Sequence, residues 1–169
     1  PHDVLFQMMQ YSDIIFGDQN EWELASGVPH IPFEALDENY EIDKEAYLAY
    51  FRKMHHLFPK CKKMVMAVRN QIASSHHTLS GLLYDAVEDQ LYTTRIYDIE
   101  PIVDPMGVGD AFVAAYIHAH QKWGDKNQYC LDFSLSASAI KNTIPGDQNL
   151  VSEEEIINNM TSSGGRIQR

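Results

Sequence analysis

The stretch Val103-Asp104-Pro105-Met106-Gly107-Val108-Gly109-Asp110-Ala111-Phe112 decides the fold. An apolar run over residues 99–103 predicts a strand before the glycines, and an apolar run from residue 111 predicts a helix after them. Gly107 and Gly109 carry no Cβ, so an anion can approach the backbone there. The first N–H groups of a helix lack intrahelical partners and carry partial positive charge. This order of strand, glycine turn and helix predicts an anion site, and phosphate is the usual ligand.

Asp110 is an unusual residue for such a site, because a carboxylate repels a phosphate. One interpretation is chemical: Asp110 accepts the proton of a hydroxyl group that attacks the phosphate. The other is structural, since aspartate is a favoured helix N-cap and Asp110 directly precedes the expected helix. Short glycine motifs are common, so the local sequence favours neither interpretation over the other.

Composition limits the class of protein. A length of 169 residues with 44% hydrophobic and 22% charged residues predicts one globular domain. The net charge of −11 argues against a nucleic-acid partner, which needs clustered lysine and arginine. No apolar run reaches membrane-spanning length, so we expect no membrane partner. The 2 cysteines form no motif and no signal-peptide pattern opens the chain, so we expect a cytoplasmic protein.

Hydrophobic periodicity predicts alternating helices and strands. The expected helices cover residues 1–10, 18–25, 43–58, 111–122, 127–142 and a short segment from 152, where Ser152 and Glu155 suit a capping box. The expected strands cover residues 14–17, 64–68, 79–85, 90–97 and 99–103, and residues 161–169 are expected to form a loose tail. The segments around the turn at 86–89 predict one antiparallel hairpin on an otherwise parallel sheet. The fold class is therefore α/β, a mostly parallel sheet with helices on both faces.

Two further groups of polar residues follow expected strands. Asp18 and Glu21 stand directly after the strand at 14–17, where acidic residues also suit the first turn of a helix, and the residues alone favour that structural role. Arg69 follows the strand at 64–68, and it is equally compatible with a phosphate ligand and with a plain surface position. The histidine pairs 55–56 and 76–77 do not predict a metal site, because adjacent side chains diverge on strands and helices.

The glycine stretch resembles the signature of a known family. Asp104-Pro105-Met106-Gly107-Val108-Gly109-Asp110 is similar to the Asp-Thr-x-Gly-Ala-Gly-Asp motif of the ribokinase-like, PfkB-type carbohydrate kinases. The segment Lys-Asn-Thr-Ile-Pro-Gly-Asp at 141–147 and the closing Gly-Gly-Arg-Ile-Gln-Arg at 164–169 resemble 2-keto-3-deoxygluconate kinases in particular. Pro105-Met106 replaces a pair of small or hydroxyl residues, and Val108 replaces an alanine. The resemblance covers the whole chain but only the C-terminal half of such a kinase, so we expect an N-terminal half and a substrate lid in addition.

The resemblance implies a ribokinase-like fold and an activity. The expected reaction is ATP-dependent phosphorylation of a sugar or sugar-acid hydroxyl, with 2-keto-3-deoxygluconate as the expected substrate. Asp110 would be the catalytic base. The backbone of Gly107, Val108 and Gly109 would hold the transferring phosphoryl group.

The resemblance also implies cofactors and their ligands. Asp18 and Glu21 stand in the place of the family's Asn-x-x-Glu motif, which serves Mg²⁺, and a second alignment would use Asn20 and Glu23 instead. Asp104 and the carbonyl of Met106 match positions that bind a monovalent cation in some relatives. The residues expected to contact ATP are Arg69, Gly81, Gly107, Gly109 and Ser136.

Alternative functions remain open on the sequence. The first is a kinase of the same family that acts on another sugar, such as fructose or ribose. The second is a non-catalytic α/β module that binds a phosphorylated ligand, although such a module gains nothing from Asp110. We also expect these 169 residues alone to lack sugar kinase activity. An exposed strand edge would favour pairing with a second copy, and we expect a homo-oligomer.

Overall fold

The computed structural model describes residues 2–32, 40–124, 126–162 and 166–167. Its elements are α1 (His2–Met9), β1 (Ile14–Gly17), α2 (Gln19–Ser26), α3 (Lys44–Leu57), β2 (Lys63–Ala73), β3 (His76–Asp85), β4 (Gln90–Thr93), β5 (Tyr97–Ile99), α4 (Val108–Trp123), α5 (Asn127–Lys141), α6 (Glu153–Thr161) and β6 (Arg166–Ile167). The predicted capping box at Ser152 and Glu155 is confirmed. The remainder of the closing motif, Gly164, Gly165, Gln168 and Arg169, lies outside the described residues. Within the described part, every helix is too short or too polar to cross a membrane.

The sheet is mixed, so the prediction of a mostly parallel sheet was wrong. It has 6 strands in the order β1-β2-β3-β5-β6, with β4 paired to β3. β1–β2 and β5–β6 are parallel, whereas β3 is antiparallel to β2, β4 and β5. The error arose at residues 69–78, which continue as a long β2–β3 hairpin instead of leaving the sheet. The tail was also misjudged in part, because Arg166–Ile167 pairs with β5 as β6.

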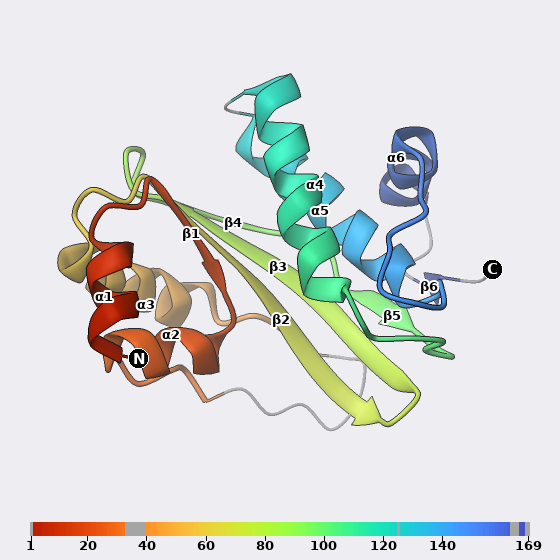
Figure 1. Ribbon diagram of the computed structural model, residues 1–169, viewed down its shortest axis with the longest axis horizontal. Coiled ribbons are helices and arrows are strands. Elements are labelled where there is room, and N and C mark those ends of the chain that lie inside the picture. Colours follow the sequence, from red (N-terminus) through yellow and green to blue (C-terminus); the bar gives the residue numbers. More distant parts are fainter. Residues whose placement is uncertain (1, 33–39, 125, 163–165, 168–169) are drawn as a thin grey trace.

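Helices cover both faces of the sheet, as predicted. In Figure 1, α1, α2 and α3 lie on one side of the long strands, and α4, α5 and α6 lie on the other. β2 serves both layers because successive side chains of a strand point to opposite faces. Val65 packs in the cluster that contains Phe112 and Leu131, whereas Met64 and Met66 pack in the cluster that contains Phe51. The sheet therefore separates two apolar cores and contributes side chains to both.

The segment that begins α4 differs from the prediction in register. β5 covers Tyr97–Ile99, so the strand expected at 99–103 starts two residues earlier and ends four residues earlier, and an irregular connection follows. α4 begins at Val108 rather than at Ala111, and Gly107 is its N-cap with φ +74°. Glycine adopts this left-handed conformation without a steric penalty. Asp110 therefore lies inside the first turn of α4.

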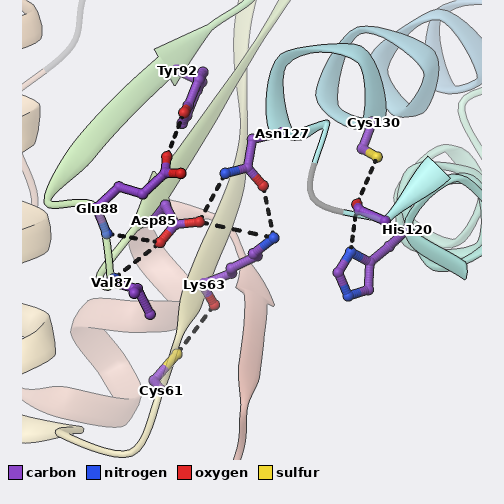
Figure 2. A network of polar contacts seen from close by, with 10 residues as sticks. Cys61, Lys63, Asp85, Val87, Glu88, Tyr92, His120, Asn127 and Cys130 are labelled. Carbon is purple, nitrogen blue, oxygen red and sulfur yellow. Dashed lines mark hydrogen bonds and ion pairs between the residues drawn. The ribbon is translucent and has the colours of Figure 1, made fainter.

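A buried polar cluster lies at the start of β2, around Lys63. The Lys63 ammonium donates to Asn127 Oδ1 (2.7 Å) and lies 3.8 Å from Asp85 Oδ2. Asn127 Nδ2 donates to the same Asp85 oxygen (2.8 Å), while Asp85 Oδ1 accepts the backbone N–H of Val87 (2.9 Å). Figure 2 shows the three side chains converging from the start of β2, the end of β3 and the start of α5. The cluster fixes where α5 lies on the sheet.

Candidate active site

A cleft of about 390 Å³ opens where β1, β2 and the N-terminus of α4 meet. Its charged lining residues are Asp18, Glu21, Arg69 and Asp110, which come from three separate segments of the chain. The remaining walls are largely apolar: Phe16, Ala67, Leu79, Val108, Phe112 and Val113. The structure thus brings together the acidic pair, the arginine and the glycine stretch that the sequence analysis selected separately.

The N-terminus of α4 presents a row of backbone donors. The first intrahelical hydrogen bond runs from Ala111 N–H to the Gly107 carbonyl (2.9 Å), and no side chain caps the helix. Within the described residues, the N–H groups of residues 107–110 have no hydrogen-bond acceptor. These are the donors that a helix leaves for an anion. The sequence analysis named the backbone of Gly107, Val108 and Gly109 as donors, and the structure adds the amide of Asp110.

The two glycines of the stretch are required for different reasons. A Cβ on Gly107 would lie 2.2 Å from the Asp147 carbonyl oxygen, and the φ of Gly107 is itself unsuited to a side chain. A Cβ on Gly109 would meet no protein atom within 4 Å. Gly107 is therefore demanded by the fold. The space beside Gly109, by contrast, lies in the cleft and is open to a ligand.

Asp110 is an exposed residue of the cleft. It is not the N-cap of α4, because Gly107 takes that position, so the structural interpretation of Asp110 does not hold. Among the described residues, no hydrogen bond or ion pair engages its carboxylate, which leaves both oxygens able to accept a proton or a hydrogen bond. The carboxylate and the free amides belong to the same helical turn.

Asp18 and Glu21 form the N-terminal cap of α2. Glu21 N–H donates to Asp18 Oδ1 (2.8 Å), and Asp18 N–H donates to Glu21 Oε2 (2.9 Å). The expected capping role is therefore present. One oxygen of each carboxylate makes no hydrogen bond to a described residue, and such oxygens suit Mg²⁺. In the second alignment Glu23 binds His30 and does not line the cleft, whereas Asp18 and Glu21 do.

The acidic pair makes the charge balance of the cleft depend on a cation. Arg69 is exposed on β2 and forms no ion pair with a described residue, although it shares the cleft with Asp18, Glu21 and Asp110. Carboxylates outnumber the guanidinium, so an anionic ligand would be repelled unless it carried a metal ion. Within the described residues no cluster of three or more metal-ligating side chains exists. The acidic pair therefore fits a metal ion whose other ligands are phosphate oxygens and water.

Two residues expected to contact ATP lie outside the cleft. Gly81 is buried beneath α5, where a Cβ would approach Thr94 to 3.1 Å and Leu131 to 3.2 Å. Ser136 donates from Oγ to the Ile156 carbonyl (2.9 Å) and accepts from Asn159 Nδ2 (2.9 Å), so it joins α5 to α6. Both positions are explained by packing, and neither lines the cleft.

Sequence reasoning missed Ser138, which does line the cleft. Its Oγ donates to the Val108 carbonyl (3.1 Å), so it ties α5 to the first turn of α4. Residues two apart on a helix point in nearly opposite directions, because each residue advances the helix by about 100°. The serines of α5 could be told apart only once its orientation was known.

Asp104 stabilises the segment that leads into the glycine turn by accepting two backbone hydrogen bonds. Its Oδ1 accepts the Met106 N–H (3.0 Å) and its Oδ2 accepts the Gly146 N–H (2.8 Å). These two donors lower the pKa of the Asp104 carboxyl below its usual range. Asp104 lies outside the cleft lining and joins the glycine turn to the turn after α5.

Comparison with known proteins gives a consistent result. No protein-family model and no curated protein sequence matches the chain. Among solved structures, a 2-dehydro-3-deoxygluconokinase from Thermotoga maritima matches with 27% identity and a TM-score of 0.80 over 95% of this chain and 45% of that one. A PfkB family carbohydrate kinase from Listeria grayi matches with 26% identity and a TM-score of 0.74 over 92% of this chain and 43% of that one.

The fold extends to more distant kinases. The ribokinase of Arabidopsis thaliana, solved with ribose and ATP, matches with 18% identity and a TM-score of 0.61 over 94% of this chain and 44% of that one. The chain thus has the ribokinase-like fold and matches PfkB/ribokinase-family kinases in structure, with similarity to their sugar kinases. It spans less than half the length of these structures.

Proposed function

We propose that this chain is the nucleotide-binding and catalytic portion of an ATP-dependent kinase that phosphorylates a sugar or sugar-acid hydroxyl. One observation carries the proposal: four backbone donors and the carboxylate of Asp110, none of them bonded to a described residue, occupy the same first turn of α4 beside a cleft. A phosphate-binding turn needs the donors alone. The added carboxylate is what a phosphoryl transfer to a hydroxyl group requires.

The chemistry follows from these groups. The hydroxyl oxygen of the substrate forms a bond to the γ-phosphorus of ATP while Asp110 accepts the hydroxyl proton. The bond between the γ-phosphorus and the oxygen of the leaving ADP breaks. The N–H groups of Gly107, Val108 and Gly109 stabilise the negative charge on the transferring group, and Arg69 contacts the phosphates. Asp18 and Glu21 would hold Mg²⁺, mostly through water, and the ion would neutralise phosphate charge.

The sugar is the finer part of the proposal, and 2-keto-3-deoxygluconate is the substrate that we propose. The support is the similarity to the T. maritima enzyme and the segment at 141–147. We place the sugar contacts in the part of such kinases that this chain does not span. No described feature of the cleft favours fructose, ribose or a non-catalytic role.

A coupled ADP-release assay tests the proposal. The longest chain that contains this sequence is supplied with Mg-ATP and, separately, 2-keto-3-deoxygluconate, fructose or ribose. Turnover with the sugar acid alone supports the full proposal, and turnover with another sugar replaces the substrate. Nucleotide binding without any turnover would indicate a binding module. Residues 1–169 alone should bind nucleotide without sugar-dependent turnover, and turnover by them would show that the sugar site is within this chain.

A further inference from the structure

Lys141, the last residue of α5, is a buried cation that the proposed chemistry does not use. Its side chain is 0% exposed, and its ammonium donates to the Ile144 carbonyl (3.0 Å). Burial of a charged ammonium is costly unless opposite charge and hydrogen-bond acceptors compensate it. A neutral side chain would fill the same space more cheaply, so the charge itself calls for a reason.

The Lys141 ammonium and the Asp104 carboxylate bind the same turn: the ammonium donates to the Ile144 carbonyl, and the Gly146 N–H donates to Asp104 Oδ2 (2.8 Å). Lys141 lies at the C-terminal end of α5, where the helix dipole is negative. Its charge acts on the Asp104 carboxylate and helps to lower the pKa of that group, after the stronger effect of the Met106 and Gly146 N–H donors. The neighbouring Asn142 carbonyl accepts the N–H groups of Val103 (2.8 Å) and Asp104 (3.2 Å). Lys141 thus stands behind the segment that carries the free donors of α4.

This position gives the ammonium an electrostatic task. Asp104 precedes the anion-binding turn by three residues, and an uncompensated carboxylate there would repel a phosphate that approaches the turn. Lys141 supplies the opposite charge from within the core. Because it is buried, salt screens it far less than it screens a surface residue.

A soluble monovalent cation does not fit beside Asp104. Both oxygens of this carboxylate already accept backbone N–H groups, and a fixed ammonium lies within electrostatic reach. A second cation would compete with these donors for the carboxylate lone pairs and would be repelled by Lys141. The expectation of a monovalent cation at Asp104, drawn from the family resemblance, therefore disagrees with the residues present.

We propose that Lys141 is a positioning residue whose buried ammonium takes the place of a soluble monovalent cation behind the anion-binding turn. The inference rests on the proposed function in so far as the anion is the phosphate of ATP. Nucleotide binding by this protein then needs no K⁺. Removal of the ammonium leaves space for a small cation beside the Ile144 carbonyl that the ammonium contacts.

The unmodified protein provides the first test. Its affinity for Mg-ADP is measured by calorimetry in K⁺, Na⁺ or tetramethylammonium chloride at one ionic strength, the last ion being too large for the site. We expect affinities that agree within about 2-fold, because each factor of 10 requires about 1.4 kcal/mol of specific binding. An affinity that is 10-fold higher in K⁺ overturns the inference.

Two variants test the site itself. Lys141→Ala should lower the Mg-ADP affinity roughly 10-fold in tetramethylammonium, and K⁺ or NH₄⁺ should restore most of it and raise the unfolding temperature. Lys141→Met keeps the volume without the charge, and it should show the same loss without rescue. Lys122→Met, which removes an exposed lysine paired with Glu153, is the control and should bind normally.

The outcomes separate this inference from the proposed function. Loss of affinity in Lys141→Met with a preserved fold, together with ion-specific rescue of Lys141→Ala, supports the inference. Normal Mg-ADP affinity in Lys141→Met overturns it. An unfolding temperature of Lys141→Ala that is the same in K⁺, NH₄⁺ and tetramethylammonium also overturns it. The unfolding measurement needs no nucleotide. A protein that shows the rescue yet binds no nucleotide therefore refutes the proposed function and leaves Lys141 as the internal cation.

Discussion

Two basic residues of the same strand, Lys63 and Arg69, have opposite environments. Lys63 begins β2, is 6% exposed and is bound to Asn127 and Asp85. Arg69 lies six residues further along, is exposed and pairs with no described residue. The first charge is satisfied entirely within the protein, as Figure 2 shows for its cluster. The second remains exposed in the cleft, where a ligand could contact it.

The difference follows from the cost of desolvation. A buried ion pair survives only when its remaining hydrogen-bonding groups are satisfied, so the Lys63 cluster stabilises one arrangement of β2, β3 and α5. An exposed and unpaired charge costs the fold little, and it can bind a partner without first breaking an internal pair. The same contrast separates the two carboxylates Asp85 and Asp110, of which the former accepts several donors and the latter accepts none that is described.

The largest expected effect concerns Asp110. In the longest chain that contains this sequence, Asp110→Asn should lower kcat of the proposed reaction by roughly 10²–10⁴ and leave nucleotide affinity nearly unchanged, because the amide keeps the shape and cannot accept the proton. Steady-state ADP release and calorimetry with Mg-ADP measure the two quantities. Near-normal turnover would remove Asp110 from the role of base.

The second effect concerns the stability that the Lys63 cluster provides at the start of β2. Lys63→Met should lower the free energy of unfolding by about 3–5 kcal/mol, since Asp85 would lose its buried counter-charge. Urea denaturation provides the measurement. Lys62→Met is the matched control, because Lys62 is 64% exposed and its ion pair with Asp13 should contribute less than about 1 kcal/mol. Equal losses in the two variants would contradict the distinction between paired interior charges and surface charges.

The third effect separates the two glycines of the turn that precedes α4. Gly107→Ala should lower the free energy of unfolding by about 1–3 kcal/mol, through its positive φ and the approach of its Cβ to Asp147. Gly109→Ala should leave stability unchanged or raise it by up to about 1 kcal/mol, since glycine is a poor helix former. Its methyl group should instead displace the phosphate, which calorimetry would record as weaker Mg-ADP binding. A folded Gly109→Ala protein with normal affinity would contradict the proposed anion site.

The smallest effect concerns Arg69 itself. Arg69→Met should weaken Mg-ADP binding roughly 10-fold, equivalent to about 1.4 kcal/mol, by removing one charged phosphate contact. Stability should stay within about 0.5 kcal/mol, as for most surface substitutions. A variant with unchanged affinity would assign Arg69 to the surface without a role in nucleotide binding.

The sequence and the structure agree best where the signal is local. Asp43 and Ser152 were read as helix starts, and both cap their helices as expected. Residues 69–73 were misjudged because they contain neither glycine nor proline to mark a turn, and their residue types do not reveal where the chain goes next. β3 pairs with both β2 and β5, and these pairings depend on contacts between residues far apart in the sequence.

The sequence by itself determined the order of helices and strands up to α6, the glycine turn at 107–109 and the unusual carboxylate of Asp110. These features depend on residues within a few positions of one another, because caps, glycine turns and apolar periodicity are local. Only the tertiary structure decided that β2 and β3 form a long antiparallel pair and that Ser138 rather than Ser136 lines the cleft. It also decided that Lys141 is buried and donates to the Ile144 carbonyl, in the turn that also donates to Asp104. Burial and neighbourhood arise from packing between distant segments, and no local pattern of residue types encodes them uniquely.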